Sequence, residues 1–237
     1  MLWMHGGGWT TGTIELDDYQ LRAQCVELQI SILNVEYRLV PEYPYSMGLE
    51  DCYASLKWAA ESPSLFSADL AKGHLATILA HRARDDPFFD NRKVTGQVLQ
   101  VPPVLHPHAV PEKYKSSLLL FEQNKEGPGA ETILWATGML GGSPTDPEIL
   151  PFLYPSHKGL PSVVIQVCGM DPLRDEALLY EKALKSDGVH WQTRLSVYSG
   201  VTHAFQYYFL DFKMTVKWEK DYWAGLRWLL EGGLNNA

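Results

Sequence analysis

The chain has 237 residues, of which 46% are hydrophobic, 12% aromatic and 20% charged. This length and apolar content suit one well-buried domain over residues 1–237 and exclude a disordered chain. No stretch approaches the roughly 20 consecutive apolar residues of a membrane helix. The formal net charge of −8, with no clustering of Lys and Arg, argues against a nucleic-acid partner.

Three cysteines, Cys25, Cys52 and Cys168, lie far apart and without the CxxC spacing of a zinc site. No disulfide framework is expected, so a reducing cytosol fits best. The apolar start of the chain has no basic region before it and no cleavage site after it, so no signal peptide is expected and the predicted location is cytoplasmic.

The first half of the chain begins with four apolar residues at 1–4, which predict a buried strand with neighbours on both sides. A β-branched run at 29–36 predicts a second strand, and Pro41 and Pro44 end regular structure after it. Apolar residues at helical spacing then predict helices over 49–60 and 74–84.

The second half alternates between strand and helix patterns. Residues 111–146 are rich in Gly and Pro, with a helical section near the middle. Strands are expected at 94–104, 162–168 and 191–197, and helices at 175–186, where Gly188 is a plausible cap, and at 214–230. This alternation predicts an α/β fold with helices packed on both faces of a mostly parallel sheet.

Three adjacent glycines follow the first strand, in the run His-Gly-Gly-Gly at 5–8. Glycines at such a place allow backbone N–H groups to point together at a small anion, as in an oxyanion hole. A flexible turn is the simpler interpretation of a glycine triplet taken alone. Its spacing matches neither a dinucleotide-binding nor a P-loop motif.

Asp171 and His203 each lie just past the end of a predicted parallel strand, the edge where α/β sheets carry their chemistry. A carboxylate there can orient an imidazole that acts as general base. Taken singly, Asp171 is better explained as a turn residue before Pro172, and His203 as a loop histidine.

The chain resembles the hormone-sensitive-lipase branch of the α/β-hydrolase superfamily, whose members are mostly carboxylesterases. Four motifs in the family's order carry the resemblance: His-Gly-Gly-Gly-Trp at 5–9, Tyr-Arg-Leu-Val-Pro-Glu-Tyr-Pro-Tyr at 37–45, Gly-Met-Asp-Pro-Leu-Arg-Asp-Glu at 169–176 and Gly-Val-Thr-His-Ala-Phe at 200–205. The resemblance implies an α/β-hydrolase fold, truncated at the N-terminus because the strands and cap segment upstream of the first motif are lacking. It also implies a small ester or lactone as substrate, and no cofactor.

By this resemblance, Gly6 and Gly7 supply oxyanion-hole N–H groups, Asp171 is the acid of a catalytic triad and His203 is its base. The family's nucleophile is a serine in a sharp strand-to-helix elbow, and the chain has no G-x-S-x-G sequence. In one alignment the strand and elbow are missing between residues 73 and 74. In a rival alignment residues 69–73 lie on the elbow and Leu70 replaces the serine.

Two other features give little evidence for a functional site. Ser143 lies between Gly142 and Pro144 without a preceding apolar strand, so a turn is expected there. His106 and His108 lack a third ligand at a suitable spacing, so no metal is predicted.

Three hypotheses remain open. The first is a carboxylesterase-type hydrolase that is inactive or severely impaired without its serine, as in a truncated or mis-assembled version of an active chain. The second is a non-catalytic, ligand-binding pseudo-hydrolase, against which the retention of both Asp171 and His203 counts mildly. The third is a lyase or isomerase with His203 as base, which is chemically allowed but not selected by any residue. The sequence predicts no oligomeric state.

Overall fold

The computed structural model of the chain describes residues 1–62, 69–71, 73–105, 110–118, 128–189 and 192–234. Within them, six strands form one sheet in the order β2-β1-β3-β4-β5-β6, and every neighbouring pair is parallel. The strands are β1 (Leu2–Met4), β2 (Leu33–Val35), β3 (Asp69–Ala71), β4 (Gly96–Gln100), β5 (Ser162–Cys168) and β6 (Thr193–Tyr198). The predicted parallel α/β sheet is therefore confirmed.

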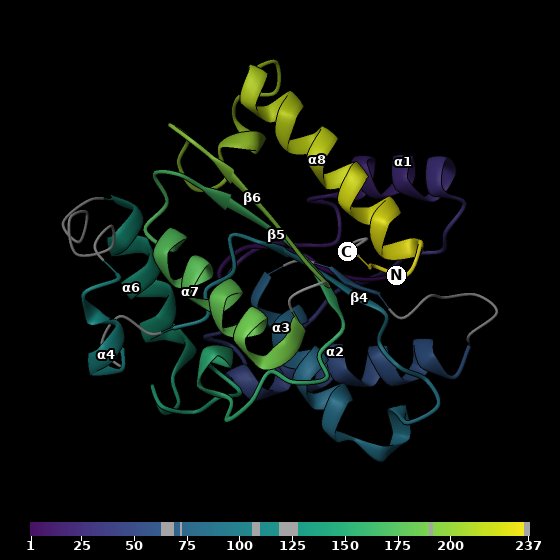
Figure 1. Cartoon of the computed structure of the whole chain (residues 1–237), viewed down its shortest axis with the longest axis horizontal. Helices are drawn as coiled ribbons and strands as arrows, with labels where there is room; N and C mark the ends of the chain where they lie inside the picture. Colours follow the sequence, from purple (N-terminus) through teal and green to yellow (C-terminus); the bar gives the residue numbers. More distant parts are fainter. Residues whose placement is uncertain (63–68, 72, 106–109, 119–127, 190–191, 235–237) are drawn as a thin grey trace.

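Helices cover both faces of this sheet (Figure 1). One face carries α1 (Asp18–Leu28) and α8 (Lys213–Leu230), and the other carries α2 (Tyr45–Ala60), α3 (Gly73–Asp85) and α7 (Arg174–Leu184). The helices α4 (Glu112–Lys115) and α6 (Pro128–Leu140) lie together at the left of Figure 1. Shorter helical segments are η1 (Pro87–Phe89), η3 (Pro151–Leu153), η4 (Lys185–Val189) and η6 (Phe205–Tyr207). No described helix has the length and hydropathy needed to cross a membrane.

The apolar strand at the start of the chain is buried on both faces. Leu2 and Met4 pack in the same cluster as residues of α2 and α3, whereas Trp3 packs with α8 and meets Tyr222 edge-to-face at 6.5 Å between ring centroids. Leu2 is paired with Leu33 on one side and with Leu70 on the other. The expected neighbours on both sides of this strand are thus present.

A three-residue strand, β3, lies at the centre of the sheet just before α3, where the sequence did not predict one. It precedes residues 73 and 74, between which the elbow strand is predicted to be missing, so that expectation stays a prediction. β3 joins β1 to β4, with Leu70 opposite Leu2 and Gln97. A short strand forms here because the backbone groups of β1 and β4 need partners at the sheet centre. Leu70, the serine position of the rival alignment, lies in the middle of β3 and is fully buried. Two apolar residues flanked by Asp69 and Lys72 give too weak a pattern to predict a strand.

Other differences from the expected elements are local. α1 was not expected, because only Leu21 and Gln24 are buried along it and its sequence has little apolar periodicity. α2 begins at Tyr45, directly after Pro44 and four residues before the expected start. Gly188 has φ of 91°, which suits the predicted role of ending a helix. The expected start of the last strand, at 191, lies outside the described residues.

Candidate active site

The predicted functional groups lie at one edge of the sheet. Because all strands are parallel, their carboxyl ends meet at this edge. Residues 5–8 follow β1, Gly73 lies two residues past β3, and Asp171 and His203 follow β5 and β6. Four loops from distant parts of the chain therefore bring their side chains and amides to the same edge.

Asp171 and His203 are in direct contact. His203 Nδ1 lies 2.7 Å from Asp171 Oδ2. The other carboxylate oxygen, Oδ1, accepts the amide N–H of Leu173 at 2.9 Å. Asp171 is completely buried, whereas the side chain of His203 is 47% exposed. A buried carboxylate therefore orients an imidazole that a ligand can reach.

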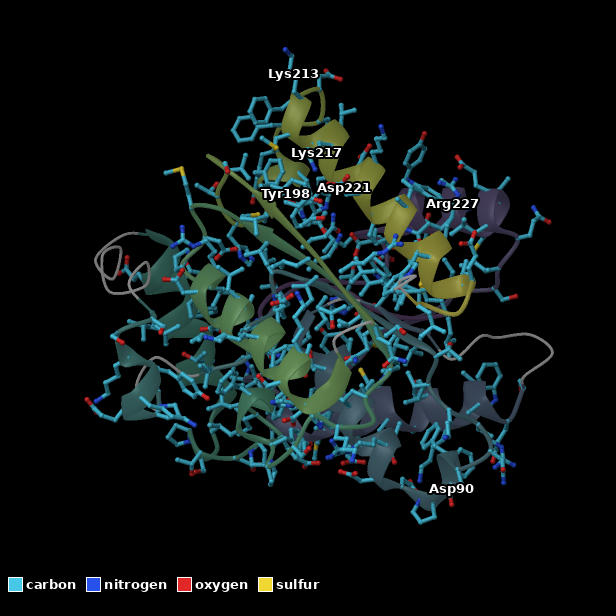
Figure 2. All side chains as sticks on the ribbon, viewed as in Figure 1. Asp90, Tyr198, Lys213, Lys217, Asp221 and Arg227 are labelled. Atoms are coloured by element: carbon cyan, nitrogen blue, oxygen red, sulfur yellow. The ribbon has the colours of Figure 1, made fainter. Side chains whose placement is uncertain are left out.

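The loops that carry this pair are tied together. The amide of Gly169 donates to the carbonyl of Tyr198 at 2.7 Å, and the amide of Met170 donates to the carbonyl of Val201 at 2.9 Å. Tyr198, at the end of β6, donates its hydroxyl to Asp221 of α8 at 3.0 Å, and Figure 2 labels both residues where β6 meets α8. These contacts fix the end of β6 before the His203 loop begins.

The electrostatics of the pair favour the protonated imidazole. Partial loss of contact with water lowers the pKa of His203, but the hydrogen bond to Asp171 and the charge of Asp171 outweigh this effect and raise the pKa above the ordinary value of 6.5. With Asp171 ionised, Nδ1 of the neutral ring carries the proton that it donates to the carboxylate. Nε2 then has the free lone pair, which is the arrangement of a general base.

The glycine loop is shaped by close backbone contacts. Gly7 has φ of 127°, and a Cβ there would lie 1.9 Å from the carbonyl oxygen of Thr11, so only glycine fits. Its carbonyl accepts the amides of Thr10 and Thr11 at 3.2 and 3.1 Å. No described backbone carbonyl accepts the N–H of Gly6 or Gly7. Both amides lie at the functional edge. Among the described residues, neither amide has a direct hydrogen bond to Asp171 or His203.

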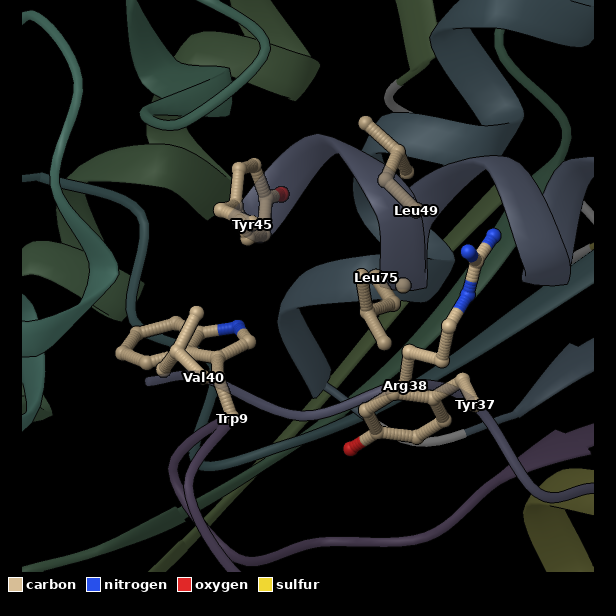
Figure 3. A pocket seen from close by; sticks show the side chains of 8 residues that line it. Trp9, Tyr37, Arg38, Val40, Tyr45, Leu49 and Leu75 are labelled. Atoms are coloured by element: carbon tan, nitrogen blue, oxygen red, sulfur yellow. The ribbon is translucent and has the colours of Figure 1, made fainter. Parts of the chain in front are cut away.

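His5 is a support for this loop. Its ring stacks on Tyr37 with 4.3 Å between centroids, and the Tyr37 hydroxyl donates to the His5 carbonyl at 2.8 Å. The neighbouring Arg38 holds Asp51 of α2 through Nε and Nη2 at 2.8 and 2.7 Å. The motif at 37–45 thus positions the glycine loop. Figure 3 shows Tyr37, Arg38 and Trp9 around a small hollow beside α2.

Trp9 and His74 link the glycine loop to α3, a connection that the sequence analysis missed. The indole Nε1 of Trp9 donates to His74 Nδ1 at 3.1 Å, and His74 Nε2 lies 2.5 Å from the carbonyl oxygen of Ile149. Burial lowers the pKa of His74 to about 4, although the hydrogen bond to Ile149 opposes this. His74 is therefore neutral at pH 7, with its proton on Nε2.

The turn between β3 and α3 has no hydroxyl or thiol. The sequence from 69 to 76, Asp-Leu-Ala-Lys-Gly-His-Leu-Ala, contains no Ser, Thr or Cys. Gly73 begins α3 with φ of 66°. Ser143, the other candidate, lies in an exposed turn where its carbonyl accepts the amide of Asp146 at 3.1 Å, as expected.

Glu176 is a second residue whose role the sequence analysis missed, although it ends the third motif. Its Oε1 accepts the amides of Val104 and Leu105 at 2.6 and 3.2 Å. Burial raises its pKa to about 8, with the two amide hydrogen bonds acting in the opposite direction. Glu176 thus joins the loop after β4 to the first turn of α7, close to Asp171 in the chain.

Within the described ranges, no group of three or more His, Cys, Asp or Glu side chains is arranged to hold a metal. His106 and His108 lie outside these ranges.

Comparison with known proteins gives consistent similarities. A profile of the alpha/beta hydrolase fold family matches residues 1–207. An AB hydrolase superfamily protein of Schizosaccharomyces pombe is 31% identical over 97% of the chain, which covers 70% of that protein. Versiconal hemiacetal acetate esterase of Dothistroma septosporum is 35% identical over 85% of the chain, which covers 64% of the esterase.

Solved structures give the same result. Vibralactone cyclase has a TM-score of 0.92 at 40% identity, with 97% of this chain and 71% of the cyclase covered. The esterase LipW from Mycobacterium marinum has a TM-score of 0.78 at 26% identity, with 92% and 68% covered. The chain thus spans 64% to 71% of the length of these four proteins.

Proposed function

The chain belongs to the α/β-hydrolase fold family, and on this premise we propose that the edge carrying Asp171 and His203 is a carboxylesterase-type site for a small ester or lactone. The single observation that carries the proposal is the 2.7 Å contact between the buried Asp171 carboxylate and the accessible His203 ring. The names of two similar proteins, an acetate esterase and a cyclase of a lactone, support this class of ligand.

The residues present can stabilise and deprotonate the groups that take part in ester hydrolysis, but they do not include a side chain that attacks the carbonyl carbon. The N–H groups of Gly6 and Gly7 stabilise the oxyanion that forms on the carbonyl oxygen. His203 Nε2 accepts a proton, and Asp171 stabilises the resulting imidazolium. The chemistry needs no cofactor, since no electrons are exchanged.

Acyl transfer is severely impaired because no serine stands at the elbow. Loss of the nucleophile of a serine hydrolase costs roughly 10⁶ in kcat, which leaves roughly 10³ to 10⁴ over water from the oxyanion hole and binding. The remaining reaction is attack by a water molecule whose proton passes to His203. A slow, His203-dependent hydrolysis is therefore proposed, in place of a covalent acyl-enzyme.

The alternative is a non-catalytic protein that binds the same ligands, and the absence of the serine favours it. The two functions differ in whether bound ester is turned over. A reducing compartment such as the cytosol suits either function, because Cys25, Cys52 and Cys168 are all free thiols.

The test uses p-nitrophenyl butyrate with the purified chain, with His203→Gln and with Asp90→Asn as a control on the surface away from the edge. We expect saturable, slow hydrolysis that His203→Gln abolishes and Asp90→Asn retains. A fluorophosphonate probe should label no serine. Saturable binding without turnover would instead identify the non-catalytic protein, and absence of both binding and turnover in a folded sample would end the proposal.

A further inference from the structure

Gly73 occupies an unusual place in the fold. It lies two residues past Ala71, the last residue of β3, and it is the first residue of α3. One residue therefore separates the end of the strand from the start of the helix at the functional edge. In α/β-hydrolases, the attacking residue stands on a sharp strand-to-helix turn of this kind, with its side chain exposed above the sheet.

The φ angle of Gly73 is compatible with such a turn. Its φ of 66° lies in the left-handed region, where side chains are strained but which elbow nucleophiles tolerate. Among the described residues, a Cβ built on Gly73 would meet only the carbonyl oxygen of Gln100, at 3.6 Å, which is an ordinary contact distance. A side chain therefore has room at this position, in contrast to Gly7, where a Cβ would clash with the backbone.

The position of Gly73 relative to Asp171 also fits. One strand, β4, separates β3 from β5, so the carboxyl ends of β3 and β5 lie about 10 Å apart, at about 4.8 Å per strand. The loop after β6 brings His203 back onto Asp171, toward β3. His203 is therefore held at the end of β5, two strands from the end of β3.

The groups around Gly73 supply the other half of an oxyanion hole. The N–H of the residue after the nucleophile contributes to the hole in this fold, and here that residue is His74. The ring of His74 is bonded to Trp9 of the glycine loop. This contact holds the glycine loop, with the amides of Gly6 and Gly7, in a fixed position relative to the amide of His74.

We infer that Gly73, rather than Leu70 or a deleted residue, occupies the nucleophile position, and that the site needs only a side-chain hydroxyl there to carry out covalent acyl transfer. This inference rests on the proposed function and adds which position launches the attack. In Gly73→Ser, the new hydroxyl oxygen bonds to the ester carbonyl carbon and passes its proton to His203 Nε2. The carbon–oxygen bond to the alcohol then breaks, and the same proton goes to the leaving alkoxide. Water reverses these steps and releases the acid.

The experiment compares the parent with Gly73→Ser and with Gly188→Ser. Gly188 has φ of 91°, and no atom of the described residues lies within 4 Å of its Cβ position. It precedes β6 and so lies at the opposite edge of the sheet. We expect a fluorophosphonate probe to label Gly73→Ser at residue 73 and to leave Gly188→Ser unlabelled. Hydrolysis of p-nitrophenyl butyrate by Gly73→Ser should exceed that of the parent by at least about 10²-fold, a part of what a native nucleophile supplies.

A double variant distinguishes a failure of the proposed function from a failure of the assignment of position 73. Gly73→Ser combined with His203→Gln should lose the labelling and the added hydrolysis. If the double variant reacts as fast as Gly73→Ser, His203 is not the base and the proposed function fails. If a folded Gly73→Ser is not labelled while the parent keeps its slow His203-dependent hydrolysis, position 73 is not the nucleophile position and the inference fails alone.

Gly73→Ala tests the room for a side chain without any chemistry. Strain at a left-handed residue should lower the melting temperature by about 2–8 °C and leave a cooperative transition. A Gly73→Ala chain that does not fold would overturn the inference, because it would show that a Cβ does not fit at the elbow.

Discussion

The carboxylate of Asp171 is wholly buried at the end of β5, yet it contacts the accessible ring of His203, 32 residues further along the chain. Asp171→Asn should lower the pKa of His203, because the variant removes the charge that raises it. NMR titration of the ring protons measures this shift. An unchanged titration would show that the pair is not formed in solution.

The same pair makes stability depend on pH in a defined direction. Since the pKa of His203 is higher in the folded chain than in the unfolded one, its contribution is complete below about pH 6.5 and is lost as the pH rises through the folded value. Urea unfolding of the parent and of His203→Gln between pH 5 and pH 9 measures the effect. The difference in unfolding free energy should fall toward high pH, and a difference that grows toward high pH would contradict the assignment.

Trp9→Phe should destabilise the chain through His74. The variant keeps the aromatic packing but removes the indole N–H, so His74 Nδ1 loses its partner. An unpaired buried polar atom costs about 1–3 kcal/mol. Denaturant unfolding against Trp135→Phe, an exposed position on α6 where the change should be below about 0.5 kcal/mol, provides the comparison.

Acidification should destabilise the chain through His81 and His157. His81 Nε2 lies 3.3 Å from His157 Nδ1, and burial lowers the two pKa values to about 2 and about 4. The unfolded chain binds these protons more tightly, so stability falls as the pH drops below about 6.5, by up to about 1.4 kcal/mol per pH unit for each histidine. His81→Phe should make the slope of unfolding free energy between pH 6 and pH 4 shallower. An equal slope in both proteins would exclude His81 as a source.

Glu176 should stabilise the folded chain in its protonated form. Because burial raises its pKa to about 8, the parent loses stability as the pH rises from about 4.5 through 8, whereas Glu176→Gln should not show this loss. Glu176→Ala removes the acceptor of the Val104 and Leu105 amides and should cost about 1–3 kcal/mol for each amide left without a partner. Chemical unfolding at pH 6 and pH 9 distinguishes the three proteins.

Local patterns in the sequence predicted the elements with strong periodicity. The apolar strand at 162–168 and the amphipathic last helix needed no knowledge of their neighbours. α1 escaped prediction because its exposed surface leaves little apolar periodicity, and β3 escaped because its three residues become a strand only between β1 and β4. Pairing across the sheet is a non-local effect that a window of sequence does not contain.

The sequence by itself determined the parallel α/β architecture, the four motifs and the absence of a serine near the elbow, because each of these depends on residue identity and local order. Only the tertiary structure decided that Asp171 and His203 touch, that Trp9 holds His74, and that Gly73 begins α3 in a left-handed conformation with space beside it. These relationships depend on strand order and on loops that meet at one edge of the sheet, where residues far apart in the chain become neighbours.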